Sequence, residues 1–412
     1  MSMTPQELWE RRWSRRGKLA AASGGASRVP PEGMISFAFG DPDPPSLPLE
    51  DMVQAAESLA ENNRRDALGY RGPIQTGELN EALAEKLARD QGIHVAPDQI
   101  MISNGGSGGL AMLSDMVLDP GDVVLHDAPA WMGATNMIRL AGAEGVGIPV
   151  DEDGIDPAKV EEALDKLEAE GKFPKFLYTI PTFQNPAGVE LSNERRQALA
   201  KISDERGLLM VEDDAYNDLR FSGEKKPTIF SLAKNGHVLF FGTLSKTIAA
   251  GLRLGYMVGP ADVVAAISRC HVDSLRNSYV AALADWFLRS GKLEEHIVEL
   301  RAVYQEKCER MLAALDREMP EGVSWTRPHG GFFVWVTLPD SLDSLKLLQD
   351  CSANGVGYIP GPAFFSDGTS GHHNFRLSYS ALDLDEIDEG IRRLGVQIKA
   401  ALAKSKVAAP AD

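Results

Sequence analysis

Nearly continuous hydrophobic runs alternate with helix-like stretches through the middle of the chain. The runs are Gln99–Ser103, Asp122–His126, Lys175–Ile180, Gly207–Val211 and His237–Phe241. Helix-like patterns follow the first three runs, over Leu110–Leu118, Met132–Ala141 and Asn193–Glu205. Continuous apolar strands, rather than alternating ones, are typical of a sheet that is buried on both faces. The pattern therefore predicts an α/β fold with a largely parallel central sheet.

The pattern changes after Pro260. A long helical stretch is predicted from Ser278 to Met319, with a break near Ser290 and Gly291. The strand-like runs GGFFVWVTLP and NFRLSYS follow, with the turn-rich segment GVGYIPGPAFF between them. A final helix is predicted from about Asp385. This order indicates a second, smaller α+β domain.

The whole chain of 412 residues is long enough for two domains. We expect an N-terminal arm and part of the small domain over 1–50, a large domain over 51–290, and a small C-terminal domain over 291–412. The arm should begin with a short amphipathic helix over about Pro5–Gly17.

Charge and cysteine content narrow the possible functions. The 42 basic and 59 acidic residues give a net charge of −17, which argues against nucleic acid as a partner. The three cysteines are far apart in the sequence and show neither zinc-ligand spacing nor a disulfide framework. No apolar run is long enough to span a bilayer, and the basic N-terminal segment, which no apolar run follows, does not predict a secretory signal. We therefore expect a cytoplasmic protein that acts on a small molecule.

A glycine-rich stretch, GGSGG over 105–109, follows the first apolar run. It satisfies the G-x-S-x-G pattern in which Ser107 would be a hydrolase nucleophile, with Asp213 as acid and His329 or His373 as base. It could equally cradle a phosphate with backbone N–H groups at a helix start. No HGGG-type segment precedes the serine, and neither G-x-G-x-x-G nor a P-loop lysine is present. This stretch alone does not distinguish the two functions.

Polar clusters follow three of the apolar runs. PTFQNPAGV follows KFLYTI, EDDAYNDLRF follows GLLMV, and GTLSKTIAAGLRLGY follows HVLFF. The carboxyl ends of parallel strands are where α/β sheets bind ligands. The strand-like run NFRLSYS also carries an arginine in its middle, which is costly to bury without a partner. These clusters predict one ligand site. The hydrolase interpretation does not explain why polar clusters stand at these strand ends.

The N-P-x-G, D-x-x-Y and SKTIAAGLR blocks, in this order, resemble the class I/II aminotransferases, which are pyridoxal-phosphate enzymes of fold type I. The similarity extends from about Phe37 to Leu394 and is strongest to the 2-aminoadipate and aromatic aminotransferase branch. The resemblance implies a large domain with a mostly parallel sheet and a smaller α+β domain. It also implies pyridoxal 5'-phosphate as cofactor and transfer of an amino group between an L-amino acid and a 2-oxo acid. Such enzymes act as homodimers with shared active sites.

The resemblance assigns three catalytic residues. Lys246 matches the lysine that forms a Schiff base with the cofactor and then moves a proton as general base and acid. Asp213, rather than its neighbour Asp214, matches the carboxylate that keeps the pyridine nitrogen protonated, so that the ring can take up electrons. Tyr216 and Asn185 match residues that hydrogen-bond the phenolic oxygen of the ring.

The remaining expected contacts surround the cofactor and substrate. Gly105, Gly106 and Ser107 would bind the phosphate at a helix N-terminus, with Ser245 and Arg253 as further ligands. The family often has Gln-Gln or Thr where this chain has Ser107 and Gly108, so the serine side chain is a departure. By resemblance Ser107 is a phosphate donor rather than a nucleophile.

Trp131 matches an aromatic residue that stacks on the pyridine ring. Arg376 matches the arginine that binds the substrate α-carboxylate, and Asn185 and Gly40 would also contact the substrate. Tyr70 matches a tyrosine that reaches the phosphate in the neighbouring subunit, which makes the site shared.

Several alternatives stay open at this point. The fold type also supports β-elimination, decarboxylation, cyclisation and oxidation of amino acids, and related domains serve as sensors in bacterial regulators. The substrate side chain is not identified: Arg71 and Arg28 could meet a distal acid, although a surface position is expected for both. No metal site is expected, including at His372 and His373, and His329 has no assigned role.

Overall fold

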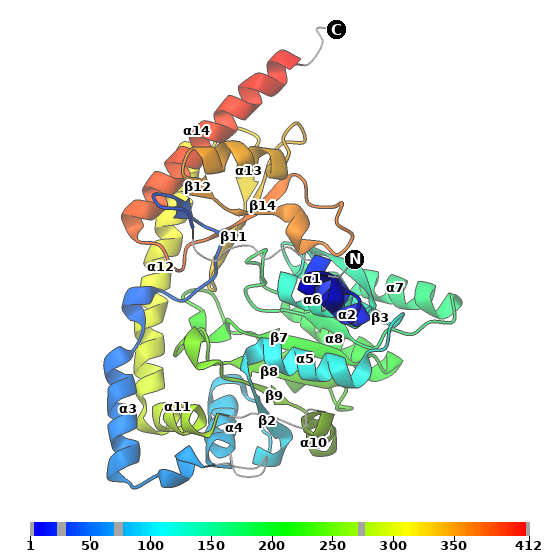
Figure 1. The fold of residues 1–412 in the computed structure, drawn as a ribbon, viewed down its shortest axis with the longest axis vertical. Coiled ribbons are helices and arrows are strands. Elements are labelled where there is room, and N and C mark those ends of the chain that lie inside the picture. The colour runs from blue at the N-terminus through cyan, green and yellow to red at the C-terminus, as the bar shows by residue number, and fades with distance from the viewer. Residues whose placement is uncertain (1–3, 23–29, 70–76, 271–276, 409–412) are drawn as a thin grey trace.

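An eight-stranded sheet forms the centre of the structure, which is a computed structural model that describes residues 4–22, 30–69, 77–270 and 277–408 (Figure 1). The strand order is β2-β9-β8-β7-β6-β3-β4-β5. In chain order the strands are β2 (Ile100–Ser103), β3 (Val123–Ala128), β4 (Glu144–Asp151), β5 (Gly154–Ile155), β6 (Leu177–Thr179), β7 (Met210–Asp214), β8 (Val238–Thr243) and β9 (Gly255–Val258). The five strands β4, β3, β6, β7 and β8 are mutually parallel. The predicted parallel sheet is confirmed.

Both faces of this sheet are buried, as the continuous apolar runs predicted. Alternate residues of one strand belong to different core clusters: Val211 packs with one cluster and Met210 with another. On one face lie α5 (Gly105–Val117), α6 (Met132–Ala141) and α10 (Ala261–Cys270). On the other lie α4 (Gly77–Gln91), α7 (Pro157–Ala169), α8 (Asn193–Arg206), α9 (Ile229–Leu232) and α11 (Ser278–Ser290).

A second, antiparallel sheet lies beside the first. Its order is β10-β11-β14-β13, from β10 (Ser324–Trp325), β11 (Phe333–Thr337), β13 (Ile359–Pro360) and β14 (Asn374–Ser378). The short strands β1 (Ile35–Ser36) and β12 (Val356–Gly357) pair with each other. The helices α12 (Lys292–Glu318), α13 (Ser344–Ala353) and α14 (Leu384–Ala408) pack beside this sheet (Figure 1). The predicted α+β unit is present, and α3 (Leu49–Glu61) extends beside α11 away from it.

The helix breaks are largely where the sequence predicted them. The long stretch from Ser278 divides at Gly291, whose φ of 79° lies in the left-handed region that glycine adopts without strain. The predicted helix over Leu110–Leu118 instead begins at Gly105, because the glycine-rich stretch itself forms the first turn. The turn-rich segment contains β13 and a short 3-10 helix over Gly361–Phe364.

The predicted single N-terminal helix over Pro5–Gly17 is wrong. The structure has two helices, α1 (Pro5–Glu10) and α2 (Arg15–Ala22). Thr4 caps α1 and Glu7 returns the contact, which fixes where the first helix starts. Arg16 of α2 pairs with Asp115 of α5, so tertiary contacts decide the position of the second helix.

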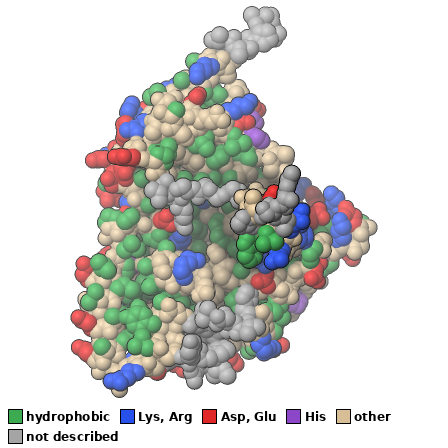
Figure 2. All heavy atoms as spheres, in the orientation of Figure 1, with side chains coloured by type: hydrophobic (Ala, Val, Ile, Leu, Met, Phe, Trp, Pro, Cys, Tyr) green, Lys and Arg blue, Asp and Glu red, His purple; other side chains and the backbone are tan. Residues whose placement is uncertain are grey.

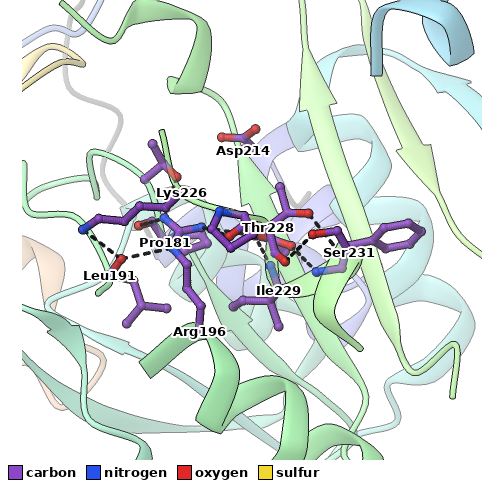
Figure 3. Close-up of polar contacts among 12 residues, drawn as sticks. Pro181, Leu191, Arg196, Asp214, Lys226, Thr228, Ile229 and Ser231 are labelled. Carbon is purple, nitrogen blue, oxygen red and sulfur yellow. Dashed lines mark hydrogen bonds and ion pairs between the residues drawn. The ribbon is translucent and has the colours of Figure 1, made fainter. Parts of the chain in front are cut away.

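A buried arginine joins α8 to the loop that follows β6 (Figure 3). Arg196 donates to the carbonyl oxygens of Pro181 and Leu191, and to the hydroxyl of Thr182. Its guanidinium also lies 3.8 Å from Glu212 of β7. Both ends of the loop over 181–191 are therefore fixed to one side chain.

In the described part of the chain, no helix is both long and apolar enough to cross a membrane. Cys270, Cys308 and Cys351 are all free thiols, as expected.

Candidate active site

A cavity of about 800 Å³ opens at the carboxyl ends of β6, β7 and β8, between the two sheets. Its lining includes residues from every polar cluster that the sequence singled out, and from the arginine-bearing strand β14. The predicted site residues among them are Gly40, Gly106, Ser107, Trp131, Asn185, Asp213, Tyr216, Ser245, Lys246, Arg253 and Arg376. The fold therefore brings together residues that are spread over more than 330 positions of sequence.

Lys246 lies just beyond the end of β8, in a partly buried position on the cavity wall. Its Nζ donates to the carbonyl oxygen of Gly40 at 2.8 Å and lies 5.4 Å from the centre of the Phe332 ring. The amine is thus held between a backbone acceptor and an aromatic face, with one side open to the cavity.

Asp213 and Asp214 are adjacent in β7 but lie on opposite faces of the sheet. Asp213 lines the cavity, and its Oδ2 accepts a hydrogen bond from Tyr178 Oη at 2.5 Å. Asp214 accepts from Gln91 of α4 on the other face. Burial raises the pKa of Asp213 to about 6, opposed by the Tyr178 hydrogen bond and the charge of Lys246. The alternation of side chains along a strand places Asp213, and not Asp214, at the cavity.

Asn185 and Tyr216 come from two different loops and lie next to each other on the cavity wall. Asn185 lies in the loop after β6 and Tyr216 lies just after β7; both are buried. A hydrogen bond from Asn185 acts to lower the pKa of Tyr216, but burial dominates and raises it. The Tyr216 ring packs edge-on against Phe332 and Phe333, which fixes the direction of its hydroxyl.

Arg376 is a buried cation without a carboxylate partner in the described part of the chain. Its Nη1 donates to Asn185 Oδ1 at 2.8 Å and its Nη2 to the carbonyl oxygen of Ala38 at 2.5 Å. Its Nε has no hydrogen-bond partner. The guanidinium lies over the rings of Phe333 and Phe364, and burial lowers its pKa to about 10. A carboxylate entering the cavity would supply the missing countercharge.

The opposite end of the cavity is built for an anion. Gly106 and Ser107 lie in the first turn of α5, where backbone N–H groups and the helix dipole favour negative charge. Arg253 reaches the same turn: a Cβ added to Gly105 would lie 2.7 Å from its Nη2. Gly105 also has φ of 73°. Ser245 is held through its backbone N–H by Thr243 Oγ1 at 3.1 Å.

Two glycines let bulky side chains close the cavity. A Cβ added to Gly133 would lie 2.2 Å from the indole ring of Trp131, so the ring packs flat over the start of α6. A Cβ added to Gly40 would lie 2.5 Å from Phe333. Close approach of the backbone is therefore required at both positions.

Some predicted residues lie elsewhere or outside the described residues. Tyr70, Arg71 and Arg28 fall in the segments that the structure does not describe. His329 contacts Ser222 at 2.8 Å, and His373 contacts the carbonyl oxygen of Leu342.

Neither histidine is among the described residues that line the cavity with Ser107. The geometry gives the hydrolase interpretation no base. No group of metal-ligating residues occurs among the described residues, and His372 pairs with Asp343.

The sequence analysis missed several residues of the site. Phe39, Met132 and Phe333 form apolar parts of the wall, and Tyr178 supports Asp213 from the core. The apolar residues carry no signal in sequence, since they look like any core position. Tyr178 does carry a signal in the sequence, because a phenol in the middle of a fully buried strand requires a polar partner.

The donor set of the cavity fits pyridoxal phosphate. The α5 N-terminus and Arg253 suit the phosphate, Asp213 suits a protonated ring nitrogen, and the Lys246 amine suits an aldehyde. The cradle at Gly105, which a Cβ would fill, allows the backbone to approach that phosphate closely.

Comparisons with known proteins agree with this chemistry. The family model for aminotransferase class I and II matches residues 32–394. The aromatic-amino-acid aminotransferase 1 of Thermococcus litoralis is 35% identical over 373 residues, which cover 90% of this chain and 89% of that protein. The 2-aminoadipate transaminase of Thermus thermophilus is 36% identical over 380 residues, which cover 90% of this chain and 91% of that protein.

A solved structure extends the similarity to three dimensions. The Pyrococcus horikoshii kynurenine aminotransferase, crystallised in complex with PMP, has a TM-score of 0.91 and 35% identity. The match covers 97% of this chain and 100% of that chain. The architecture of both sheets is therefore shared with a fold type I enzyme.

Proposed function

The chain belongs to the class I and II aminotransferases, and from this premise we propose that it moves an amino group between an L-amino acid and a 2-oxo acid through a cofactor bound covalently at Lys246. It is a pyridoxal-phosphate-dependent enzyme of fold type I. When bound, the cofactor supplies an aldehyde for the amino group and a ring that takes up electrons. The observation that carries the proposal is the buried Arg376, which shares one cavity with Lys246 and Asp213.

Each residue then has a defined task. Arg376 binds the α-carboxylate of the substrate with its fork of N–H donors, and Asn185 fixes the orientation of that fork. The Nζ of Lys246, free once the substrate amine has replaced it on the cofactor, would take the proton from the substrate α-carbon. As general acid it would then deliver that proton to the cofactor carbon that carried the aldehyde. Asp213 holds a proton at the ring nitrogen, while Asn185 and Tyr216 donate to the phenolic oxygen. Trp131 covers the ring and excludes water.

Phosphate binding is assigned to the other end of the cavity. Gly105, Gly106 and Ser107 donate backbone N–H groups, with Ser245 and Arg253 as side-chain ligands. We propose the cytoplasm as the location of the enzyme. The named relatives act on aromatic amino acids and 2-aminoadipate, and kynurenine is a substrate in the named structure. Amino acids with long or aromatic side chains are therefore the first substrates to test.

We also propose that the enzyme is a homodimer in which Tyr70 reaches the phosphate of the partner's site. Apolar side chains are exposed over α3, α11 and the segment before Tyr70: Leu49 is 68% exposed and Leu68 is 78% exposed. Beside them is a hollow of about 320 Å³ lined by Ala56, Leu59 and Tyr279, among others. Figure 2 shows hydrophobic side chains gathered over α3 and α11. Exposed apolar patches of this kind mark protein interfaces.

Covalent attachment can be tested directly. The purified protein is mixed with pyridoxal phosphate, reduced with borohydride, digested and mapped by mass spectrometry. We expect the reduced label on the peptide that contains Lys246, and no label in Lys246→Arg. A colourless protein, or a label on another lysine, contradicts the proposal.

The reaction class needs a second measurement. We expect the wild-type holoenzyme, mixed with a panel of amino acids, to change from the absorption of bound pyridoxal phosphate to that of the pyridoxamine form. It should release the matching 2-oxo acid at the same time. Release of carbon dioxide, hydrogen peroxide, or ammonia with pyruvate would instead assign another pyridoxal reaction.

A further inference from the structure

Tyr178 contacts the site from inside the core, on the side away from the cavity. It lies in the middle of β6, fully buried, with His126 of β3 and Val211 of β7 as its neighbours in the sheet. Asp213 is two residues beyond Val211 and therefore on the same face of the sheet. The tyrosine Oη donates to Asp213 Oδ2 at 2.5 Å. A buried phenol thus donates to the carboxylate of β7 that lines the cavity.

A second buried carboxyl lies near this pair. Asp127 Oδ2 accepts from the backbone N–H of Ile180 at 3.1 Å and from Gln184 Nε2 at 3.3 Å. Its Oδ1 has no partner in the described part of the chain. Burial raises the pKa of Asp127 to about 7, and the charge of Asp213 raises it further. A hydrogen bond from the Thr179 side chain opposes this rise, but the pKa of Asp213 is raised less far, to about 6. The negative charge of the two carboxyls is therefore favoured on Asp213.

The remaining charged and titratable groups around Asp213 are Lys246, Tyr216 and Asp214. The charge of Lys246 also stabilises the carboxylate, but this amine gains and loses a proton in the proposed reaction. The Tyr178 hydroxyl takes no part in that transfer. Its hydrogen bond is available to Asp213 at every stage.

We propose that Tyr178 is a positioning residue, which holds Asp213 ionised and aimed at the ring nitrogen of the bound cofactor. The inference rests on the proposed function of the cavity. Tyr178 itself has no contact with the cavity: it is not among the described lining residues. Its effect must therefore pass through Asp213, and this property makes the inference testable.

The test is a double-mutant cycle on cofactor binding. Tyr178→Phe removes the hydroxyl and keeps the ring, Asp213→Asn removes the charge, and a third protein carries both changes. The dissociation constant of pyridoxal phosphate is measured by equilibrium dialysis between pH 5.5 and 8.5. Tyr379→Phe is the matched control: it also removes one buried hydroxyl, which donates to the carbonyl oxygen of Gly331 at 2.7 Å.

We expect Tyr178→Phe to weaken binding about tenfold near neutral pH, the usual effect of losing a hydrogen bond to a charged group. As the pH is lowered, cofactor binding by Tyr178→Phe should weaken at a higher pH than in wild type. The reason is that Asp213 loses a group that favours its ionised form. On the Asp213→Asn background, Tyr178→Phe should change binding by less than about twofold. Tyr379→Phe should leave both the affinity and its pH dependence unchanged.

Two results would overturn the inference. One is an equal loss of cofactor affinity from Tyr178→Phe in the wild-type and the Asp213→Asn backgrounds, which would show a general structural effect. The other is a pH profile for Tyr178→Phe that matches Tyr379→Phe. Failure of the proposed function gives a different result, since wild type itself would then bind no cofactor at Lys246.

Discussion

At the scale of single residues, Asp213 and Asp214 show how position within a strand separates two identical side chains. Asp213 faces Tyr178 and the cavity, whereas Asp214 faces Gln91 on the other side of the sheet. The Oδ1 of Asp214 has no partner in the described part of the chain. Burial raises the pKa of Asp214 to about 7, helped by the charges of Glu212 and Asp218. Asp213 is available to a ligand, whereas Asp214 is buried away from the cavity, and its ionised form has an energetic cost.

That cost predicts a pH-dependent stability. The pKa of Asp214 in the folded protein lies above its ordinary value of 3.8. The contribution of Asp214 to the stability of the fold is therefore fully present below pH 3.8 and is lost as the pH rises through about 7. Asp214→Asn should therefore stabilise the protein relative to wild type by about 2 kcal/mol more at pH 8 than at pH 5. Urea unfolding of the cofactor-free protein at both pH values measures this difference.

Asp367→Asn provides the control. Hydrogen bonds from Ser370 lower the pKa of Asp367 below 3.8, so its contribution is lost only as the pH falls below both test values. The effect of that substitution should be the same at pH 5 and pH 8. If Asp214→Asn behaves in the same way as this control, then Asp214 does not titrate as a buried carboxyl.

At the scale of elements, α8 determines the shape of the loop that carries Asn185. Arg196 of α8 is 1% exposed and donates to carbonyl oxygens at both ends of that loop, and also to that of Pro227 at 3.2 Å (Figure 3). Its charge lies 3.7 Å from Glu190 and 3.8 Å from Glu212. A helix on the far face of the sheet thus positions a loop on the cavity side.

Removal of this arginine should be strongly destabilising. Arg196→Met keeps an unbranched side chain, but it leaves the buried Glu212 without its nearby cation and several carbonyl oxygens without their donor. We expect a loss of about 3–5 kcal/mol in the free energy of unfolding, measured by urea denaturation. The control is Lys201→Met on the exposed side of the same helix, whose distant pairing with Glu205 should be worth less than about 1 kcal/mol. A loss of similar size in both variants would refute the role of the buried network.

At the scale of the whole molecule, two sheets share one site. The central sheet supplies Lys246, Asp213 and the anion-binding helix start, while Arg376 comes from the antiparallel sheet. The distance between amine and guanidinium therefore depends on how the two halves pack. We propose that the boundary between the large and the small domain lies near residue 290. The far end of α3 and α11 is the surface that we assign to a second copy of the chain.

The dimer proposal makes a specific prediction for that surface. Leu49→Glu combined with Val53→Glu places two charges on the exposed apolar face of α3. We expect sedimentation velocity to show a dimer for wild type and a monomer for this variant, with cofactor affinity lowered because Tyr70 no longer reaches the partner's site. Val396→Glu, on the exposed face of α14 at the opposite end of the molecule, should remain a dimer. A monomeric wild type contradicts the proposal.

Local chemistry was readable from the chain itself. Continuous apolar runs predicted the buried parallel sheet, because a strand covered on both faces has no polar side. Polar blocks after those runs predicted a ligand site at the strand ends, and the order of the blocks indicated the family. The glycines at 105 and 106 predicted a helix start suited to an anion.

Other features depend on residues that are distant in sequence, so no local pattern encodes them. The two N-terminal helices, which were expected as one, depend in part on contacts with α5. The support of Asp213 by Tyr178 and the missing countercharge of Arg376 arise only when strands are placed side by side. Sequence by itself determined which chemical groups this protein has and which elements carry them. Only the tertiary structure decided which groups meet, because burial and direction are set by neighbours from elsewhere in the chain.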